Sequence, residues 1–201
     1  MQLRLTDKKR AAILSAAVQE FRTHGYDATS MDKLAAAAEV SKRTLYNHFP
    51  SKDDLFAAIL QQLWQHASQH IVPGFLPEAD LLQQLEHFLL AKALSLTDPA
   101  MVDLSRVAIA ATIHNPERAR DIVERLGKME SGLADWISAA QQAQLLKAGD
   151  AEAMGSFLVA MLKAQLFWPQ VTMGKPALSE AEVRAHVQLC SAMFCSYYRL
   201  N

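Results

Sequence analysis

The segment 27–54 constrains the fold of this chain more than any other, because two short helical patterns follow each other with only a few residues between them. The first pattern covers 31–38, where apolar residues recur with a helical period. The second covers 42–49, begins after Ser41 and ends before Pro50. Serine is a favoured N-terminal cap, and proline cannot continue a helix. The sequence therefore predicts a helix-turn-helix.

The second of these helices carries an unusual set of side chains. It is too short to be stable alone, and only Leu45 and Phe49, four residues apart, can anchor it to a core. Its other side chains are donors suited to base edges and phosphates, as in Arg43 to guanine. We expect DNA contacts, phosphates included, from Thr29, Ser30, Lys42, Arg43, Thr44, Tyr46, Asn47, His48 and Lys52. The alternative is a three-helix bundle that binds protein.

Composition predicts an all-α fold. The 201 residues include only seven Gly and seven Pro, set among runs rich in Ala, Leu, Gln and Glu. Residues 1–55 hold nine Lys/Arg and seven Asp/Glu, and residues 56–201 hold eleven and fourteen. A weakly basic head on an acidic body suits a modest phosphate footprint and not a long basic channel for DNA.

Capping signals divide the chain into nine expected helices. Gly25 should end the first in a left-handed conformation, and Asp98, Asp150 and Ser179 should cap later ones. We expect a three-helix head, 1–55, and a six-helix effector and dimerisation body, 56–201, linked by the fourth helix. The expected helices are 7–24, 31–38, 42–49, 52–71, 78–96, 99–114, 116–146, 151–168 and 180–201, with 171–178 as a loop.

The head resembles a known family over residues 10–59. The matching residues are Phe21, Gly25, Tyr26, Thr29, Ser30, Met31, Leu34, Ala35, Ala38, Val40, Ser41, Thr44, Leu45, Tyr46, His48, Phe49, Ser51, Lys52 and Leu55. The segment looks like the DNA-binding domain of the TetR family of transcriptional regulators. The resemblance implies a homodimer that binds a palindromic operator, most often as a repressor, and an effector pocket in the body. One departure is Glu39, where family members usually have glycine; a left-handed turn there would cost roughly 1–2 kcal/mol.

The last two expected helices have apolar stripes wider than one packing contact requires. Because the family pairs these helices with their twins, we expect a dimer interface there; burial within one protomer is the alternative. The expected interface residues are Phe157, Met161, Trp168, Val187, Cys190, Phe194 and Tyr197.

The rest of the body would enclose a small, largely apolar effector. Large apolar and aromatic side chains with a few polar atoms suit such a ligand. The expected lining is Trp64, His66, Phe88, Met101, Ile109, Ile113, Trp136 and Phe167. His66 and His70, four residues apart, leave a metal-responsive regulator as an alternative, although no nearby carboxylate or cysteine completes a site.

Other functional classes find little support in the sequence. It holds no nucleophile elbow, no phosphate-binding glycine loop and no zinc-protease motif, so we expect neither an enzyme nor a cofactor. No segment resembles a signal peptide or a membrane span. Cys190 and Cys195 lie about 140° apart around one expected helix, so we expect them unbonded in a reduced, cytoplasmic protein.

Overall fold

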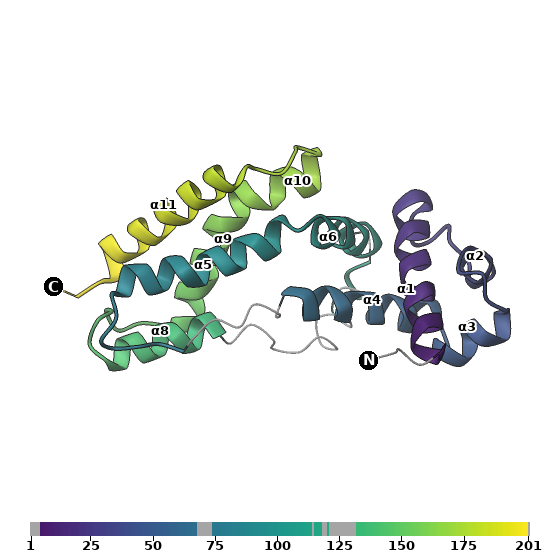
Figure 1. Cartoon of the computed structure of the whole chain (residues 1–201), viewed down its shortest axis with the longest axis horizontal. Coiled ribbons are helices and arrows are strands. Elements are labelled where there is room, and N and C mark those ends of the chain that lie inside the picture. The colour runs from purple at the N-terminus through teal and green to yellow at the C-terminus, as the bar shows by residue number, and fades with distance from the viewer. Residues whose placement is uncertain (1–4, 68–73, 114, 118–119, 121–131, 201) are drawn as a thin grey trace. The chain divides into compact units, whose positions relative to one another are not determined.

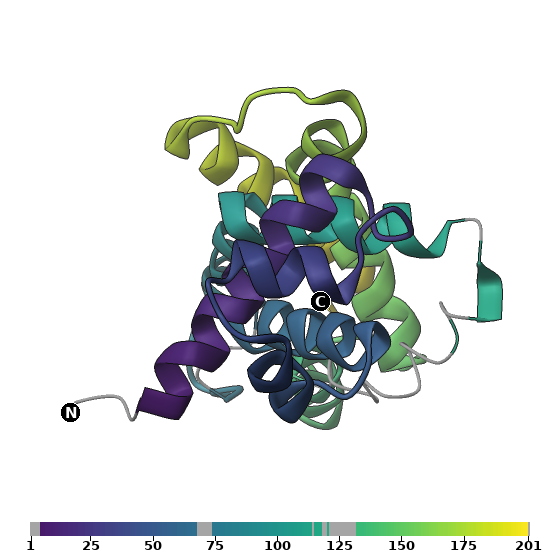
Figure 2. The same cartoon turned by 90° about the vertical axis from the view of Figure 1, so that its right-hand side faces the viewer.

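The computed structural model describes the backbone of residues 5–67, 74–113, 115–117, 120 and 132–200, and the side chains of these residues except 5 and 63–67. Figures 1 and 2 show helices joined by turns. Within the described residues no strand forms, and the only strand-like pairing is an isolated bridge between Leu146 and Arg199. The predicted all-α fold is confirmed. No described helix has both the length and the apolar character needed to cross a membrane.

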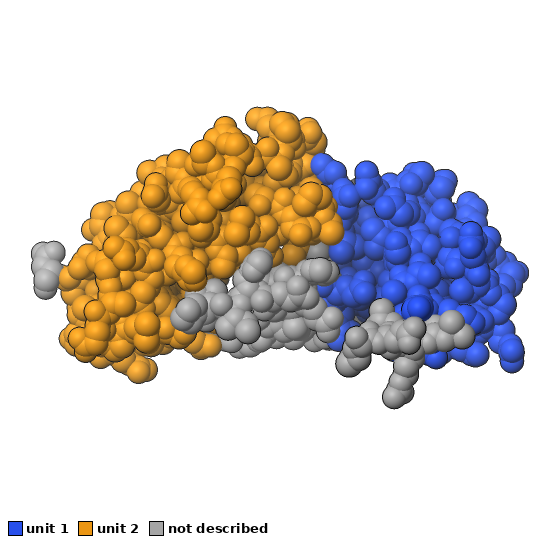
Figure 3. All heavy atoms as spheres, viewed as in Figure 1, with its two compact units in different colours: residues 1–65, 103–127 blue, residues 66–102, 128–201 orange. Residues whose placement is uncertain are grey.

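The chain divides into two compact units. Unit 1 comprises residues 1–65 and 103–127, and unit 2 comprises residues 66–102 and 128–201. Figure 3 colours them blue and orange. Unit 1 contains α1 (Leu5–His24), α2 (Met31–Ala37), α3 (Lys42–His48) and nearly all of α4 (Lys52–Ala67).

The core of unit 1 is built on three aromatic rings. The ring centroids of Phe21, Tyr26 and Phe56 lie 5.0–6.1 Å apart, which is the spacing of favourable aromatic pairs. These rings join α1, the turn that follows it and α4. The aliphatic side chains that complete this core include Ile13, Leu14, Leu34, Leu45, Leu55, Ile59 and Leu60.

Local capping confirms the predicted helix starts in unit 1. The Ser30 hydroxyl accepts a hydrogen bond from the Lys33 backbone N–H, and the Ser41 hydroxyl accepts one from Thr44. Ser51 does the same for Asp54, whose carboxylate accepts a bond from the Ser51 hydroxyl in return. These contacts satisfy N–H groups that a helix leaves unpaired at its start.

The turn between α2 and α3 is a left-handed helix cap at Glu39, whose φ is +53°. The Glu39 N–H donates to Ala36 O and the Val40 N–H donates to Ala35 O. This pair of bonds is the Schellman motif, in which glycine is the usual left-handed residue. The glutamate therefore carries the conformational cost that the sequence suggested. Gly25, at φ +81°, ends α1 as predicted without that cost.

Unit 2 is a helical core in which α11 packs against both α5 and α9, and α8 packs against α9. Asp80 caps α5, Asp150 caps α9, and Ser179 with Glu182 forms a capping box on α11. The caps at Asp150 and Ser179 were predicted from the sequence. The helices are α5 (Leu81–Thr97), α8 (Gly132–Gln142), α9 (Ala151–Leu166), α10 (Trp168–Met173) and α11 (Glu180–Tyr198).

Several predicted boundaries were wrong. Helix α8 ends at Gln142 and not near residue 146, because Gln144 adopts φ +59° and forms a second Schellman motif. Residues 171–178 were predicted as a loop, yet α10 occupies 168–173 and ends at Gly174 with φ +63°. Proline in the first turn of α10 starts this extra helix. Most of the first half of the predicted helix 116–146 lies outside the described residues.

Helix α6 (Pro99–Thr112) belongs to both units. Its cap is confirmed: the Asp98 carboxylate accepts hydrogen bonds from the N–H groups of Ala100 and Met101, at 2.7 and 3.2 Å. Residues 99–102 fall in unit 2, and the rest of the helix falls in unit 1. Leu104, Val107 and Ala111 are buried in the core of unit 1. The head is therefore completed by a helix that lies far from it in sequence.

The left-handed turn predicts the effect of Glu39→Gly. Glycine removes the cost of a positive φ but adds freedom to the unfolded chain, so we expect a net gain of about 0.5–1 kcal/mol in the free energy of unfolding. Urea unfolding followed by circular dichroism measures this change. Glu39→Ala is the matched control and should show no gain, because alanine keeps the Cβ. An equal gain in stability for both variants would show that loss of the Glu39 charge, and not relief of the positive φ, causes the effect.

Candidate nucleic-acid interface

Helix α3 presents two faces of opposite character. Leu45 is fully buried and Phe49, the residue that ends the helix, is nearly so. The side chains of Lys42, Arg43 and Asn47 are exposed. The predicted anchoring by Leu45 and Phe49 is confirmed. A helix of seven residues is held by one buried face, which leaves its donors available on the other.

Two polar residues of α3 are partly engaged by the helix itself. The hydroxyl groups of Thr44 and Ser41 lie 2.8 Å apart in a hydrogen bond, and Thr44 is half-buried. His48 is also half-buried, with its ring 6.3 Å from that of Phe49. Tyr46, by contrast, is 47% exposed. The outer face of α3 is therefore led by Lys42, Arg43, Tyr46 and Asn47.

The two cations at the start of α3 differ in their surroundings. The Lys42 ammonium lies 2.7 Å from a carboxylate oxygen of Asp32, which stands in the first turn of α2. Within the described part of the chain, the Arg43 guanidinium makes neither an ion pair nor a side-chain hydrogen bond. Arginine presents a planar fork of donors, so Arg43 is ready for bidentate contact with guanine or phosphate.

Lys52 and Thr29, both expected at phosphates, lie within a network internal to the head. The Lys52 ammonium donates to the carbonyl oxygens of Tyr26 and Thr29, at 2.8 and 3.0 Å, and lies 4.2 Å from the centre of the Tyr26 ring. The Tyr26 hydroxyl donates to Asp53. Thr29 is buried, and its hydroxyl donates to Gly25 O. These contacts favour a structural role for both residues, which hold the turn before α2 against α4.

One contact on the head was missed by the sequence analysis. The Arg10 guanidinium lies 4.6 Å from the centre of the Phe49 ring, within the range of a cation–π interaction. It joins α1 to the end of α3. Residues 39 positions apart share no helical period, so no spacing pattern in the sequence could indicate this pair. Packing alone brings them together.

Comparison with known proteins identifies the family to which the chain belongs. Residues 13–59 match the model of bacterial regulatory proteins of the tetR family. Residues 83–200, more than half of the chain, match the C-terminal domain of AefR-like transcriptional repressors. The chain belongs to the TetR family. Members of this family are helix-turn-helix, DNA-binding regulators of transcription and not enzymes.

Solved structures match 96–98% of the chain. A TetR family regulator from Pseudomonas syringae pv. tomato str. DC3000 is 42% identical, with a TM-score of 0.86, and the match covers 98% of this chain and 100% of that one. The Flavonoid-responsive Regulator FrrA is 26% identical, with a TM-score of 0.76, over 96% of this chain and 98% of its own.

A curated relative matches over only a short part of the chain. The HTH-type transcriptional activator FasR of Mycolicibacterium smegmatis is 46% identical over 56 residues, which are 28% of this chain and 26% of FasR. The chain thus matches about a quarter of the length of this curated relative. A match this short does not show that the chain binds or controls what FasR does.

Eight side chains were expected to line the family's effector pocket, and those that the structure describes differ from one another in burial. Trp136 and Phe167 are buried in the core of unit 2, and Phe88 packs half-buried against that core. Met101 is buried, Ile109 is half-buried and Ile113 is exposed. The side chains of Trp64 and His66, and residue His70, lie outside the described residues. Among the side chains that are described, no group of three potential metal ligands comes together.

The last helices carry a second apolar stripe outside the core. Val187, Cys190 and Phe194 are buried in the core of their own protomer. The neighbouring stripe of α11, spaced four residues apart at Leu189, Met193 and Tyr197, is 53–65% exposed. Phe157 of α9 and Trp168 of α10 are also exposed, and Met161 is half-buried. Leu189 and Met193 were not among the expected interface residues, although this spacing could have identified them.

The two cysteines are free, as predicted, and both are buried in unit 2. Burial raises the pKa of both thiols above its ordinary value, because the charged thiolate is poorly solvated there. The Cys190 sulfur lies 3.7 Å from a ring nitrogen of His186, and that nitrogen is 3.0 Å from Met161 O. A buried thiol held in the neutral form is unreactive, so these residues serve packing.

The network around Lys52 predicts a loss of head stability in Lys52→Ala. Removing a charged donor from two carbonyl oxygens and an aromatic face should lower the free energy of unfolding by about 1–3 kcal/mol. Thermal unfolding followed by circular dichroism measures the loss. Lys33→Ala, which removes an exposed lysine from α2, is the matched control. Unchanged stability combined with weaker binding to every DNA sequence would instead make Lys52 a direct phosphate contact.

Proposed function

We propose that this regulator is a repressor that binds a palindromic operator as a homodimer in the absence of ligand, and that a small, largely apolar effector releases it. The observation that carries the proposal is the outer face of α3, where exposed donors stand on a helix anchored by Leu45 and Phe49. An ordinary surface helix would carry paired Glu and Lys there. Such donors suit the major groove.

Each residue of this face has a proposed role. Arg43 binds a base edge, and Lys42 binds a base or a phosphate. Tyr46, Asn47 and His48 donate to phosphates or base edges, and the Thr44 methyl group contacts thymine. Ser30 and the turn before α2 approach the phosphate backbone. Thr29 and Lys52 act through that turn, because their polar groups bind its carbonyl oxygens.

The dimer is proposed to form through α9, α10 and α11. Their exposed apolar side chains would otherwise face water, and large exposed apolar patches usually mark an interface. In this proposal the interface comprises Phe157, Met161, Trp168, Leu189, Met193 and Tyr197, while Val187, Cys190 and Phe194 support it from the protomer's core. A symmetric dimer presents two α3 helices about one helical turn of DNA apart, or about 34–36 Å.

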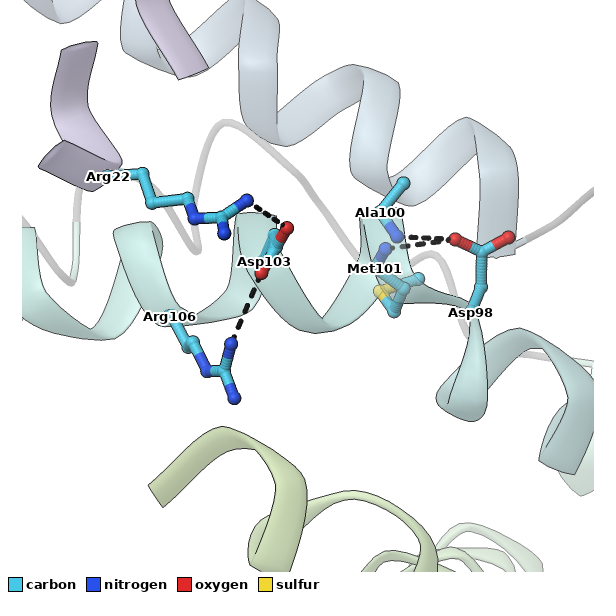
Figure 4. Close-up of polar contacts among 6 residues, drawn as sticks. All are labelled: Arg22, Asp98, Ala100, Met101, Asp103 and Arg106. Atoms are coloured by element: carbon cyan, nitrogen blue, oxygen red, sulfur yellow. Dashed lines mark hydrogen bonds and ion pairs between the residues drawn. The ribbon is translucent and has the colours of Figure 1, made fainter. Parts of the chain in front are cut away.

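The effector is proposed to act through the two helices that pass between the units. Helix α4 crosses the boundary near residue 65, and α6 crosses it near residue 102. Figure 4 shows Asp103 of α6 between Arg22 of α1, at 2.6 Å, and Arg106, at 3.2 Å. A ligand-induced shift of α6 would therefore act on α1 directly. Moving occupancy from 99:1 to 1:99 requires the ligand to prefer the released state by about 5.5 kcal/mol.

The relatives support this class of effector and of regulation. FrrA is by its name responsive to flavonoids, which are small aromatic molecules. Trp136 and Phe167 are buried in the core of unit 2 and Phe88 packs against it, so in this proposal such a ligand enters that core to contact their rings. The body matches the domain of a repressor group, whereas FasR is named an activator, so we propose repression on the match that covers more of the chain.

The proposed operator predicts the outcome of selecting bound sequences from a random DNA pool with the purified full chain. We expect a palindrome whose half-sites lie about one helical turn apart, because the two recognition helices of a dimer read successive major grooves. The recovered sequence would then identify the genes downstream of matching sites. Enrichment of a single half-site would contradict the dimer, and absence of enrichment would contradict operator reading by the ligand-free protein.

The base contact proposed for Arg43 predicts a sequence-dependent loss in Arg43→Ala. Loss of a bidentate contact should cost about 1–3 kcal/mol on the selected operator and relax the preference at one base pair in each half-site. Titration of the operator and of variants at each position measures both effects. Arg184→Ala, which removes an exposed arginine from α11, is the control for net charge. Equal weakening on random DNA would restrict Arg43 to phosphate contact.

A further inference from the structure

The ion pair between Lys42 and Asp32 has a consequence for how strongly the head binds DNA. We propose that Asp32 is an internal competitor for DNA at Lys42, and that it weakens binding to DNA of every sequence. The inference rests on the proposed role of α3 in binding DNA. It assigns to α2 a residue that limits affinity, in addition to the residues that α3 supplies.

The geometry of the pair is that of a phosphate contact. The Lys42 ammonium nitrogen lies 2.7 Å from Asp32 Oδ2, a normal length for a charge-assisted bond from nitrogen to an anionic oxygen. A DNA phosphate offers the same kind of oxygen at the same distance. Lys42 is the first residue of α3, and Asp32 stands in the first turn of α2. Asp32 therefore accepts the hydrogen bond that the Lys42 ammonium would otherwise donate to a phosphate oxygen of DNA.

The exposure of the pair makes it a competitor that DNA can displace. The side chains of Lys42 and Asp32 are 67% and 58% exposed. Exposed ion pairs are weak, because water screens them and two long side chains must be ordered. DNA can thus take Lys42 from Asp32 at small cost. Asp32 then remains as a negative charge close to the phosphates, and this repulsion adds to the cost of binding.

Arg43 provides the contrast on the same turn of α3. Within the described residues its guanidinium has no carboxylate partner, whereas Lys42 has one at contact distance. Of two adjacent cations, one is available to DNA and the other is already paired. A head with both cations unpaired would bind phosphates of any sequence more tightly and would occupy more non-operator DNA. Asp32 reduces this sequence-independent part of the binding.

The test is Asp32→Asn in the full chain. Asparagine keeps the size of the side chain and removes its charge. We expect binding to both the selected operator and a random duplex of equal length to tighten about two- to five-fold at about 0.1 M salt. A plot of log K against log salt should steepen by up to about 0.9 for each head, since the Asp32 carboxylate no longer offsets the charge of Lys42 beside the phosphates.

Two control variants identify the cause. Asp135→Asn, an exposed carboxylate of α8 in unit 2, changes the net charge equally and should leave binding unchanged. In a Lys42→Ala background, Asp32→Asn should have less effect, because only direct repulsion of phosphates is then relieved. A circular dichroism melt of each variant verifies that the head is folded.

The opposite outcomes overturn the proposal. Weaker binding of Asp32→Asn would show that Asp32 positions Lys42 for its contact instead of competing for it. Unchanged affinity and salt dependence would show that the pair does not matter to binding. Failure of the underlying function is a different result: Arg43→Ala and Lys42→Ala would then both leave DNA binding unchanged, which would remove α3 from the interface.

Discussion

The anchoring of α3 is the interaction on which the rest of this molecule depends. A helix of seven residues has little stability of its own, so its conformation is held by burying Leu45 and Phe49 in the core of the head. That core is centred on the rings of Phe21, Tyr26 and Phe56. It is completed by apolar residues of α6. The donors of α3 therefore stand in fixed positions because the opposite face of the helix is buried in the core.

The head shows how packing decides what a lysine does. Lys42 and Lys52 both stand at a helix start, and the sequence predicts a DNA contact for each of them. In the structure Lys52 donates to two carbonyl oxygens of the turn before α2, whereas Lys42 pairs with the solvent-exposed carboxylate of Asp32. The first is a structural contact that is costly to break. The second is a weak ion pair, because water screens it.

The body follows the same physical logic on a larger scale. Helix α11 carries two apolar stripes, and only one of them is needed to close the core of unit 2. The stripe of Leu189, Met193 and Tyr197 is left on the surface. Phe157 and Trp168 are also apolar and exposed. Helix α6, capped by Asp98 and held by Asp103, extends from this unit into the head.

Local signals in the sequence determined the all-α class, the helix-turn-helix, most helix starts and the family, because caps and apolar periods act within a few residues. They also indicated the strained turn at Glu39, since its left-handed φ follows from a local motif. They missed α10, the end of α8 and the pair of Arg10 with Phe49. Periodicity shows that a stripe is apolar but not which neighbour covers it. Only the tertiary structure separated Val187, Cys190 and Phe194 in the core from the exposed stripe beside them, because burial depends on elements far away in the chain.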